Sequence, residues 1–204
     1  NKSITYKYMK RTIFTIAALS ITTLMHATVR DTVNINRGWQ FHLGPLSGVS
    51  DMRTAKTQTV NLPHDFLINQ PWVEPDASER PDNSDAGSNV RSRLSPRGFK
   101  EMNTGWYRYE LTPSAAWKGR RVMLDFQGIM LVGDVWVNGE LVGGTDYGYL
   151  GFDIDITDRL RFDSPNEIVV KADTREPNNS RWYTGGGLYR DVNIIVTDRK
   201  LYFP

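Results

Sequence analysis

The residues with the clearest capacity for chemistry lie in the stretch 178–192, which reads Asn-Asn-Ser-Arg-Trp-Tyr-Thr-Gly-Gly-Gly-Leu-Tyr-Arg-Asp-Val. Asn178, Asn179 and Arg181 offer the directional hydrogen bonds that hydroxyl groups need. Trp182 and the tyrosine after it add flat apolar faces that suit one face of a sugar ring. The pattern favours carbohydrate binding, but an ordinary glycine-rich turn, in which two aromatic side chains pin a loop, explains the same residues.

Three consecutive glycines, Gly185 to Gly187, follow these polar and aromatic residues. They remove every side chain at a point where the backbone must turn tightly or let another group come close. Their spacing does not match the Gly-x-Gly-x-x-Gly fingerprint of a dinucleotide site, and no helical pattern follows. The triplet therefore predicts a tight turn and not a nucleotide site.

Two shorter motifs are further candidates for a site. Pro63-His64-Asp65 is a rigid strand exit followed by two polar side chains, although an Asp that caps its own turn explains it equally well. Asn166-Glu167 could be an amide that tunes a general acid, but it follows Ser164-Pro165 and opens a strand, so we favour a turn. Glycosidases need two paired carboxylates, and no pair stands out among acids that alternate with apolar residues along strands.

Other kinds of catalytic and metal site find no support in the sequence. No serine lies in a Gly-x-Ser-x-Gly elbow, so a hydrolase triad has no candidate nucleophile. The chain has three His and no Cys, and isolated His residues do not match the spacing of a zinc site. We expect no catalytic residue, no metal ligand and no cofactor in this stretch.

The first 27 residues have the pattern of an export signal. Met9-Lys10-Arg11 precedes a run, 12–25, that is apolar or small throughout, and cleavage after Ala27 is plausible. The run is shorter than the roughly 20 residues of a membrane span, so a membrane anchor is the weaker alternative. We interpret 1–27 as a signal peptide whose N-terminus is over-extended, and we expect a periplasmic or secreted protein.

Removing this leader changes the charge of the chain. It takes away four of the 25 basic residues and none of the 23 acidic ones, which leaves 21 basic against 23 acidic. A near-neutral chain argues against a nucleic-acid partner. Without cysteine there is no disulfide framework, so the stability of the fold has to come from burial.

Short strands account for most of the sequence after residue 34. Apolar residues recur with a period of two in several segments, which are separated by turn residues, and no long helical period occurs. Val135-Trp136-Val137-Asn138-Gly139 begins the clearest hairpin, because Asn-Gly tolerates the positive φ angles of a type I′ turn. We predict an all-β fold, an antiparallel β-sandwich of jelly-roll type. The residues expected to be buried are Trp39, Phe41, Val122, Leu124, Phe126, Val135, Val137, Ile168, Val170 and Ile194.

Two segments depart from the strand pattern. Residues 71–100 are polar and contain four prolines, and a loop of this length is usually functional or disordered. We expect it to be partly ordered near the binding face. Residues 199–204 read as the start of a linker to a further domain, so the predicted sandwich domain covers 28–198.

Five short motifs in this order resemble the N-terminal sugar-binding domain of glycoside hydrolase family 2, and its β-galactosidases most. The motifs are Gly38-Trp39-Gln40-Phe41, Leu62-Pro63-His64-Asp65, Gly105-Trp106-Tyr107-Arg108, Val135-Trp136-Val137-Asn138-Gly139 and the segment from Arg181 to Val192. The resemblance runs from about Asn36 to Val196. It implies a galactose-binding-domain-like sandwich, followed in such enzymes by an immunoglobulin-like domain and a (β/α)8 barrel that holds both catalytic glutamates.

The same resemblance implies a role for the loops of this domain. In the family, they reach the mouth of the barrel and help to hold the terminal sugar. The corresponding residues here are Asp65 and the loop with Asn178, Asn179, Arg181 and Trp182. We therefore expect the sugar-binding part of an exported hydrolase of terminal β-galactosides, whose partners are carbohydrate and the two further domains. The alternatives are a free-standing carbohydrate-binding module and a purely structural sandwich.

Overall fold

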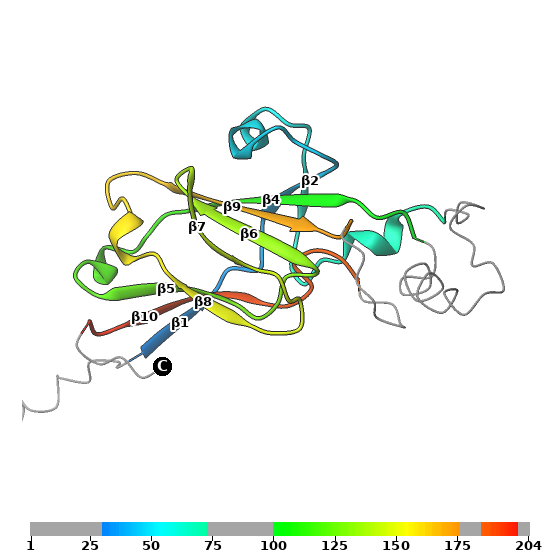
Figure 1. Ribbon diagram of the computed structural model, residues 1–204. Coiled ribbons are helices and arrows are strands. Elements are labelled where there is room, and N and C mark those ends of the chain that lie inside the picture. Colours follow the sequence, from blue (N-terminus) through cyan, green and yellow to red (C-terminus); the bar gives the residue numbers. More distant parts are fainter. Residues whose placement is uncertain (1–29, 73–99, 176–184, 200–204) are drawn as a thin grey trace, which may run out of the picture.

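The computed structural model describes residues 30–72, 100–175 and 185–199, which form two antiparallel sheets packed face to face (Figure 1). Asn178, Asn179, Arg181 and Trp182, the leader 1–27 and most of the polar segment lie outside the described residues. No helix in the described ranges is long and apolar enough to cross a membrane.

The smaller sheet has four strands in the order β1-β10-β5-β8, and the larger has six in the order β3-β2-β4-β9-β6-β7. The strands of the smaller sheet are β1 (Arg30–Asn34), β10 (Val192–Thr197), β5 (Arg121–Phe126) and β8 (Phe152–Asp155). Those of the larger are β3 (Gln58–Val60), β2 (Trp39–Leu43), β4 (Thr104–Leu111), β9 (Asn166–Asp173), β6 (Val132–Val137) and β7 (Glu140–Thr145). The predicted all-β antiparallel sandwich of jelly-roll type is confirmed.

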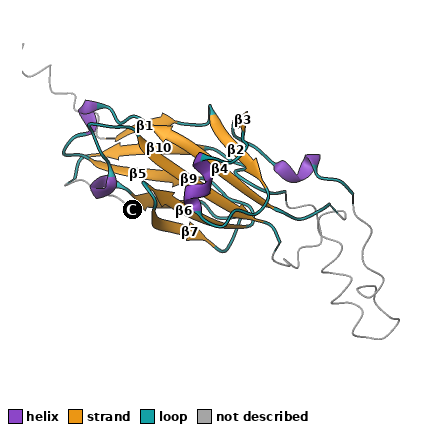
Figure 2. Ribbon diagram, turned by 90° about the horizontal axis from the view of Figure 1, so that it is seen from above, coloured by secondary structure: helices purple, strands orange, loops and turns teal. Residues whose placement is uncertain are grey.

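Short 3-10 helices occupy four of the connections: η1 (Val49–Arg53), η2 (Phe66–Asn69), η4 (Ala115–Trp117) and η5 (Thr157–Arg159). η1 lies over the outer face of the six-stranded sheet, as the view from above shows (Figure 2). η2 lies at one end of the sandwich, where the described chain breaks off at residue 72 (Figure 1). These two helices therefore border different surfaces of the domain.

The core lies between the sheets and contains all ten residues that the alternation predicted to be buried. Trp39, Tyr107 and Phe126 are its largest fully buried side chains. The indole N–H of Trp39 donates to the carbonyl of Ile35 over 2.7 Å, so burial leaves no unpaired donor there. In the strands that carry these ten residues, the inward face is thus the one that the period of two indicated.

The β6–β7 hairpin also has the predicted turn. Asn138 has φ 54° and Gly139 has φ 86°, as a type I′ turn requires. The Asn138 amide donates to the carbonyl of Arg159 and to the amide oxygen of Asn166, both over 2.9 Å. These two hydrogen bonds connect the turn to the loop before β9 and to the first residue of that strand.

The edge strand β1 was not expected from the sequence. It reads Arg-Asp-Thr-Val-Asn, a sequence in which apolar residues do not alternate with polar ones. Most of its side chains are exposed. It forms because β10 offers an open edge, and the two strands pair from Arg30 with Thr197 to Asn34 with Asn193. Backbone pairing rather than burial therefore places β1.

Candidate functional site

Asp65 lies at the exit from β3, where its carboxylate joins two distant parts of the chain. Its Oδ1 accepts a hydrogen bond of 3.0 Å from the backbone N–H of Leu67 and so caps η2. The same oxygen accepts a bond of 2.9 Å from the backbone N–H of Gly186. The carboxylate therefore fixes the first turn of η2 against the glycine triplet, 121 residues further along the chain.

The glycine triplet packs so closely that side chains would not fit. Gly185 has φ 73°, and a Cβ there would lie 2.8 Å from Asp65 Oδ2. Gly187 has φ 107°, and a Cβ there would overlap the Tyr107 hydroxyl and approach the carbonyl oxygen of His64 to 2.9 Å. Both requirements predicted for the triplet, a tight turn and a close approach, are present.

Thr174, which precedes the segment 176–184, lies close to the glycine triplet that follows this segment. Thr174 follows β9, and its hydroxyl accepts from the N–H of Asn103 over 3.0 Å and donates to the carbonyl of that residue over 2.8 Å. A Cβ on Gly186 would lie 2.8 Å from both Leu67 and Thr174, so the two anchors are in contact range. The structure thus brings residues on both sides of this segment, Thr174 and Gly186, together near Asp65, while the four predicted loop residues are outside its described part.

His64 extends the site from the glycine turn toward Phe41. Its Nδ1 lies 2.9 Å from the Tyr107 hydroxyl, and its ring packs edge-on against Phe41. Burial lowers the pKa of the His64 imidazole, so the ring favours its neutral form. Burial also raises the pKa of the Tyr107 hydroxyl, which therefore remains a neutral hydrogen-bonding group.

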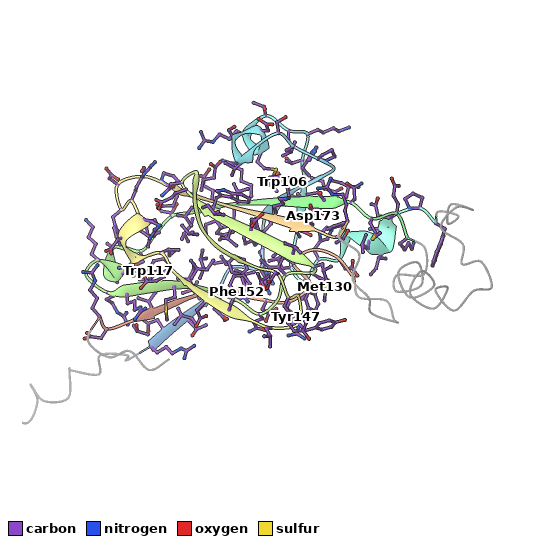
Figure 3. The ribbon with its side chains drawn as sticks, viewed as in Figure 1. Trp106, Trp117, Met130, Tyr147, Phe152 and Asp173 are labelled. Atoms are coloured by element: carbon purple, nitrogen blue, oxygen red, sulfur yellow. The ribbon has the colours of Figure 1, made fainter. Side chains whose placement is uncertain are left out.

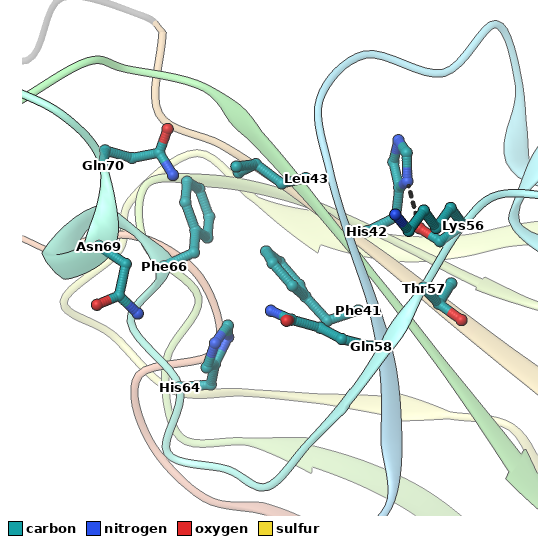
Figure 4. A pocket seen from close by; sticks show the side chains of 10 residues that line it. All are labelled: Phe41, His42, Leu43, Lys56, Thr57, Gln58, His64, Phe66, Asn69 and Gln70. Carbon is teal, nitrogen blue, oxygen red and sulfur yellow. Dashed lines mark hydrogen bonds between the residues drawn. The ribbon is translucent and has the colours of Figure 1, made fainter.

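His64 and Phe41 line a cavity of about 460 Å³ between the β2–β3 hairpin and η2 (Figure 4). Phe41 and Phe66 form its apolar floor, and the amides of Gln58 and Asn69 stand at its rim (Figure 4). Sequence reasoning selected His64 but not these two amides, because nothing in their local pattern separates them from surface residues. The cavity and Asp65 share the short segment between β3 and η2.

Glu167, the rejected candidate for a general acid, is held by two guanidinium groups. Its carboxylate accepts from Arg108 Nε over 2.7 Å and from Arg53 Nη2 over 2.8 Å. These bonds lower the pKa of Glu167, and the bond from Arg53 has the largest effect. A general acid needs a raised pKa, so the arrangement stabilises the outer face of the sheet and does not prepare proton donation.

Asn166 has a structural role as well. It is fully buried, and its Nδ2 donates to the carbonyl of Arg161 over 2.8 Å while its Oδ1 accepts from the N–H of that residue, also over 2.8 Å. The amide thereby closes the loop before β9, as the turn interpretation predicted. Among the described residues, no group of three or more His, Asp or Glu side chains is placed to hold a metal ion.

The described residues thus form a two-sheet antiparallel sandwich that carries the polar side chains of its β3–η2 connection at one edge. Residues 98–183 match the sequence profile described as "Glycosyl hydrolase 2 galactose-binding domain-like". The chain is 32% identical over 170 residues to the β-galactosidase BoGH2A of Bacteroides ovatus, an alignment that covers 82% of this chain and 18% of the relative. It is 26% identical over 185 residues to a β-glucuronidase of Bacteroides fragilis, which covers 88% of this chain and 22% of that enzyme.

Solved structures agree with these sequence matches. A glycosyl hydrolase family 2 member from Bacteroides cellulosilyticus superimposes with a TM-score of 0.66 at 33% identity, over 82% of this chain and 20% of that one. A putative β-galactosidase from Bacteroides fragilis superimposes with a TM-score of 0.64 at 28% identity, over 83% of this chain and 24% of that one. The chain belongs to glycoside hydrolase family 2, and its described residues form the galactose-binding-like N-terminal domain of that family. It spans about a fifth of the length of the relatives that it matches.

Proposed function

We propose that this domain is the sugar-binding N-terminal part of an exported β-galactosidase-type enzyme that hydrolyses terminal β-galactosides. The observation that carries the proposal is the Asp65 carboxylate, which accepts a hydrogen bond from Gly186 where the residues that flank 176–184 lie in contact range. Relatives named β-galactosidase support the activity. The leader-like residues 1–27 support export.

In this proposal the domain binds and orients the sugar, and the chemistry belongs to a barrel elsewhere in the parent enzyme. Asp65 accepts hydrogen bonds from sugar hydroxyls, and Asn178 and Asn179 can both donate and accept. Trp182 offers an indole face to the apolar side of the ring. Arg181 either contacts the sugar or holds Asp65 through a charge-assisted bond. The proposed partners are therefore the glycoside and the two following domains.

A β-glucuronide is the second candidate substrate, because several relatives are named β-glucuronidases. The charge of Asp65 opposes it. An ionised carboxylate accepts hydrogen bonds only, and it repels the carboxylate of a uronic acid at short range. The anchored Asp65 thus favours a neutral galactoside over a glucuronide.

The test is kinetic and uses the full-length parent enzyme with nitrophenyl β-galactoside and nitrophenyl β-glucuronide. Asp65→Ala should reduce kcat/KM for the galactoside by about 1–3 kcal/mol of transition-state stabilisation, the scale of a lost bond to a charged group. Asp65→Asn keeps an oxygen for the two backbone amides and isolates the loss of charge.

Asp51→Asn is the matched control, because Asp51 also accepts a backbone N–H, that of Ser47 over 3.0 Å, but lies in η1. It should leave kcat/KM unchanged. An Asp65→Ala enzyme that is folded and retains full kcat/KM for the galactoside would refute the role of this residue. Faster turnover of the glucuronide than of the galactoside by the unmodified enzyme would select the second candidate.

A further inference from the structure

A second cavity, of about 270 Å³, lies on the outer face of the six-stranded sheet beneath the β2–β3 connection that carries η1. Its floor comes from three adjacent strands, and the connection contributes an apolar wall that includes Val49. The side chain of Trp106 projects from β4 toward η1 (Figure 3). The room is slightly below the roughly 300–1,000 Å³ of pockets for drug-sized ligands, which suits a molecule the size of one sugar ring.

Two buried polar atoms at this cavity have no hydrogen-bond partner among the described residues. They are the hydroxyl of Thr104 and the indole nitrogen of Trp106, whose side chains are 1% and 4% exposed. Because the two residues are two positions apart on β4, both point to the outer face of the sheet. Buried polar groups are nearly always paired, so an unpaired donor beside an unpaired hydroxyl leaves two hydrogen-bonding positions for a bound molecule to fill.

The charges around the cavity are balanced. The ammonium group of Lys171 lies 3.8 Å from a carboxylate oxygen of Asp134 and 3.6 Å from one of Asp173. Arg175 bonds the second of these carboxylates over 2.7 Å. Two cations and two carboxylates leave no net charge for an ionic ligand, but they offer both donors and acceptors. A neutral ligand rich in hydroxyl groups satisfies such a set.

The remaining wall is aromatic. Trp136 is half-buried and stacks on Trp106, with 5.7 Å between the ring centroids and 24° between the planes. An indole with part of its surface accessible suits the apolar face of a pyranose ring. The cavity thus combines an aromatic surface, unpaired buried polar atoms and charge-balanced hydrogen-bonding groups.

We propose that this cavity is a sugar-binding site for one neutral pyranose ring, separate from the edge that contains Asp65. Thr104 and the indole N–H of Trp106 bind ring hydroxyls, and Trp136 contacts the ring face. The site does not depend on the function proposed for Asp65, since the two share no residue.

The experiment is a titration of the ¹⁵N-labelled chain with methyl β-galactopyranoside, observed at the indole N–H resonance of Trp106. Trp106→Phe identifies that resonance by its loss. A saturable shift with a Kd of about 1–10 mM is expected, the range of a site with few hydrogen bonds. Thr104→Val, which replaces an unpaired hydroxyl with a methyl group of similar size, should weaken binding about three- to tenfold.

A further variant and a stability measurement make the result specific. Thr32→Val, on the outer strand β1, should leave the Kd unchanged, and an unaltered melting temperature for Thr104→Val shows that its fold is intact. The proposal is wrong if the resonance does not shift saturably up to about 100 mM sugar, which would indicate bound water only. It is equally wrong if Thr104→Val binds as well as the unmodified chain.

Discussion

Asp65 has a structural role that any functional test must separate from sugar binding. One of its oxygens caps η2 through Leu67 and holds the glycine turn through Gly186. The substitution Asp65→Ala removes both bonds, so we expect the free energy of unfolding to fall by about 1–3 kcal/mol. Asp65→Asn should remain within about 0.5 kcal/mol of the unmodified chain, because Asn and Asp cap helices equally well.

Urea denaturation of the three chains measures this difference directly. A kinetic loss in Asp65→Asn, whose stability is retained, then reports on the sugar and not on the fold. Equal stability of Asp65→Ala and the unmodified chain would show that the two backbone hydrogen bonds contribute little. The bond from Gly186 to Asp65 would then not be needed to hold the glycine turn in place.

Glu167 gives the domain a defined dependence on pH. Its two arginine partners lower its pKa in the folded state below the ordinary value of 4.5. The stabilisation is therefore complete above about pH 4.5, where the unfolded carboxylate is also ionised, and it is lost as pH falls through the lower folded pKa. Glu167→Gln should flatten the dependence of unfolding free energy on pH in this acidic range.

Glu140→Gln is the control for that measurement. Glu140 pairs with Arg159 over 3.0 Å, but its side chain is 61% exposed, whereas that of Glu167 is 12% exposed. Exposed pairs contribute little to stability, so the control should retain the slope of the unmodified chain. If both variants show that same slope, Glu167 does not account for the acid sensitivity.

Among the elements, the β6–β7 hairpin permits a clean test of backbone conformation. A Cβ on Gly139 meets nothing within 4 Å, but its φ of 86° is unfavourable for any other residue. We expect Gly139→Ala to lower the free energy of unfolding by about 1–2 kcal/mol through conformation alone. In Gly48→Ala a Cβ is also unobstructed, but φ is −168°, so the change should be within about 0.5 kcal/mol. Chemical denaturation compares the two, and equal effects would contradict the argument.

The elements that the sequence predicted are those that bury one face. Strand β5 alternates Val122, Leu124 and Phe126 with Met123 and Asp125, and burial of the first three in the core leaves one possible register. Strand β1 has no such signal, since it depends on pairing with β10 and not on side-chain burial. Alternation of apolar and polar residues therefore cannot predict an edge strand made of polar residues.

At the candidate site, the sequence could single out Asp65 but not the groups that its carboxylate binds. Asp65 could be selected because a polar side chain follows a rigid strand exit. Its partner is a backbone N–H of Gly186, and no side-chain pattern marks which distant amide a carboxylate will bind. The cavity at Trp106 was hidden for a similar reason: η1 covers an outward-facing residue that alternation alone assigns to the wet side of the sheet.

At the scale of the whole molecule, we propose that the described sandwich binds the sugar and that a barrel elsewhere in the parent enzyme supplies the catalytic pair. Retaining glycosidases need two carboxyl groups about 5–5.5 Å apart, one of which has a raised pKa. Glu167 fails the second condition. The strongest remaining pair is Asp125 and Asp153, which are opposite each other on β5 and β8. Burial and the charge of Asp125 raise the pKa of Asp153 there.

We nevertheless expect the isolated chain to hydrolyse no nitrophenyl β-galactoside above background. Asp125 already accepts a hydrogen bond of 2.9 Å from Asn193, and the pair lies on the outer face of the four-stranded sheet, opposite the buried face that contains Leu124. Such a surface neither excludes water nor orients a sugar, and both are needed for glycoside cleavage. The measurement is release of nitrophenol by the purified chain, alongside Asp153→Asn and Glu167→Gln. Turnover that persists through purification and disappears in one of these variants would show that the domain carries a catalytic carboxylate of its own. The proposal that this domain only binds the sugar while a barrel performs catalysis would then be wrong.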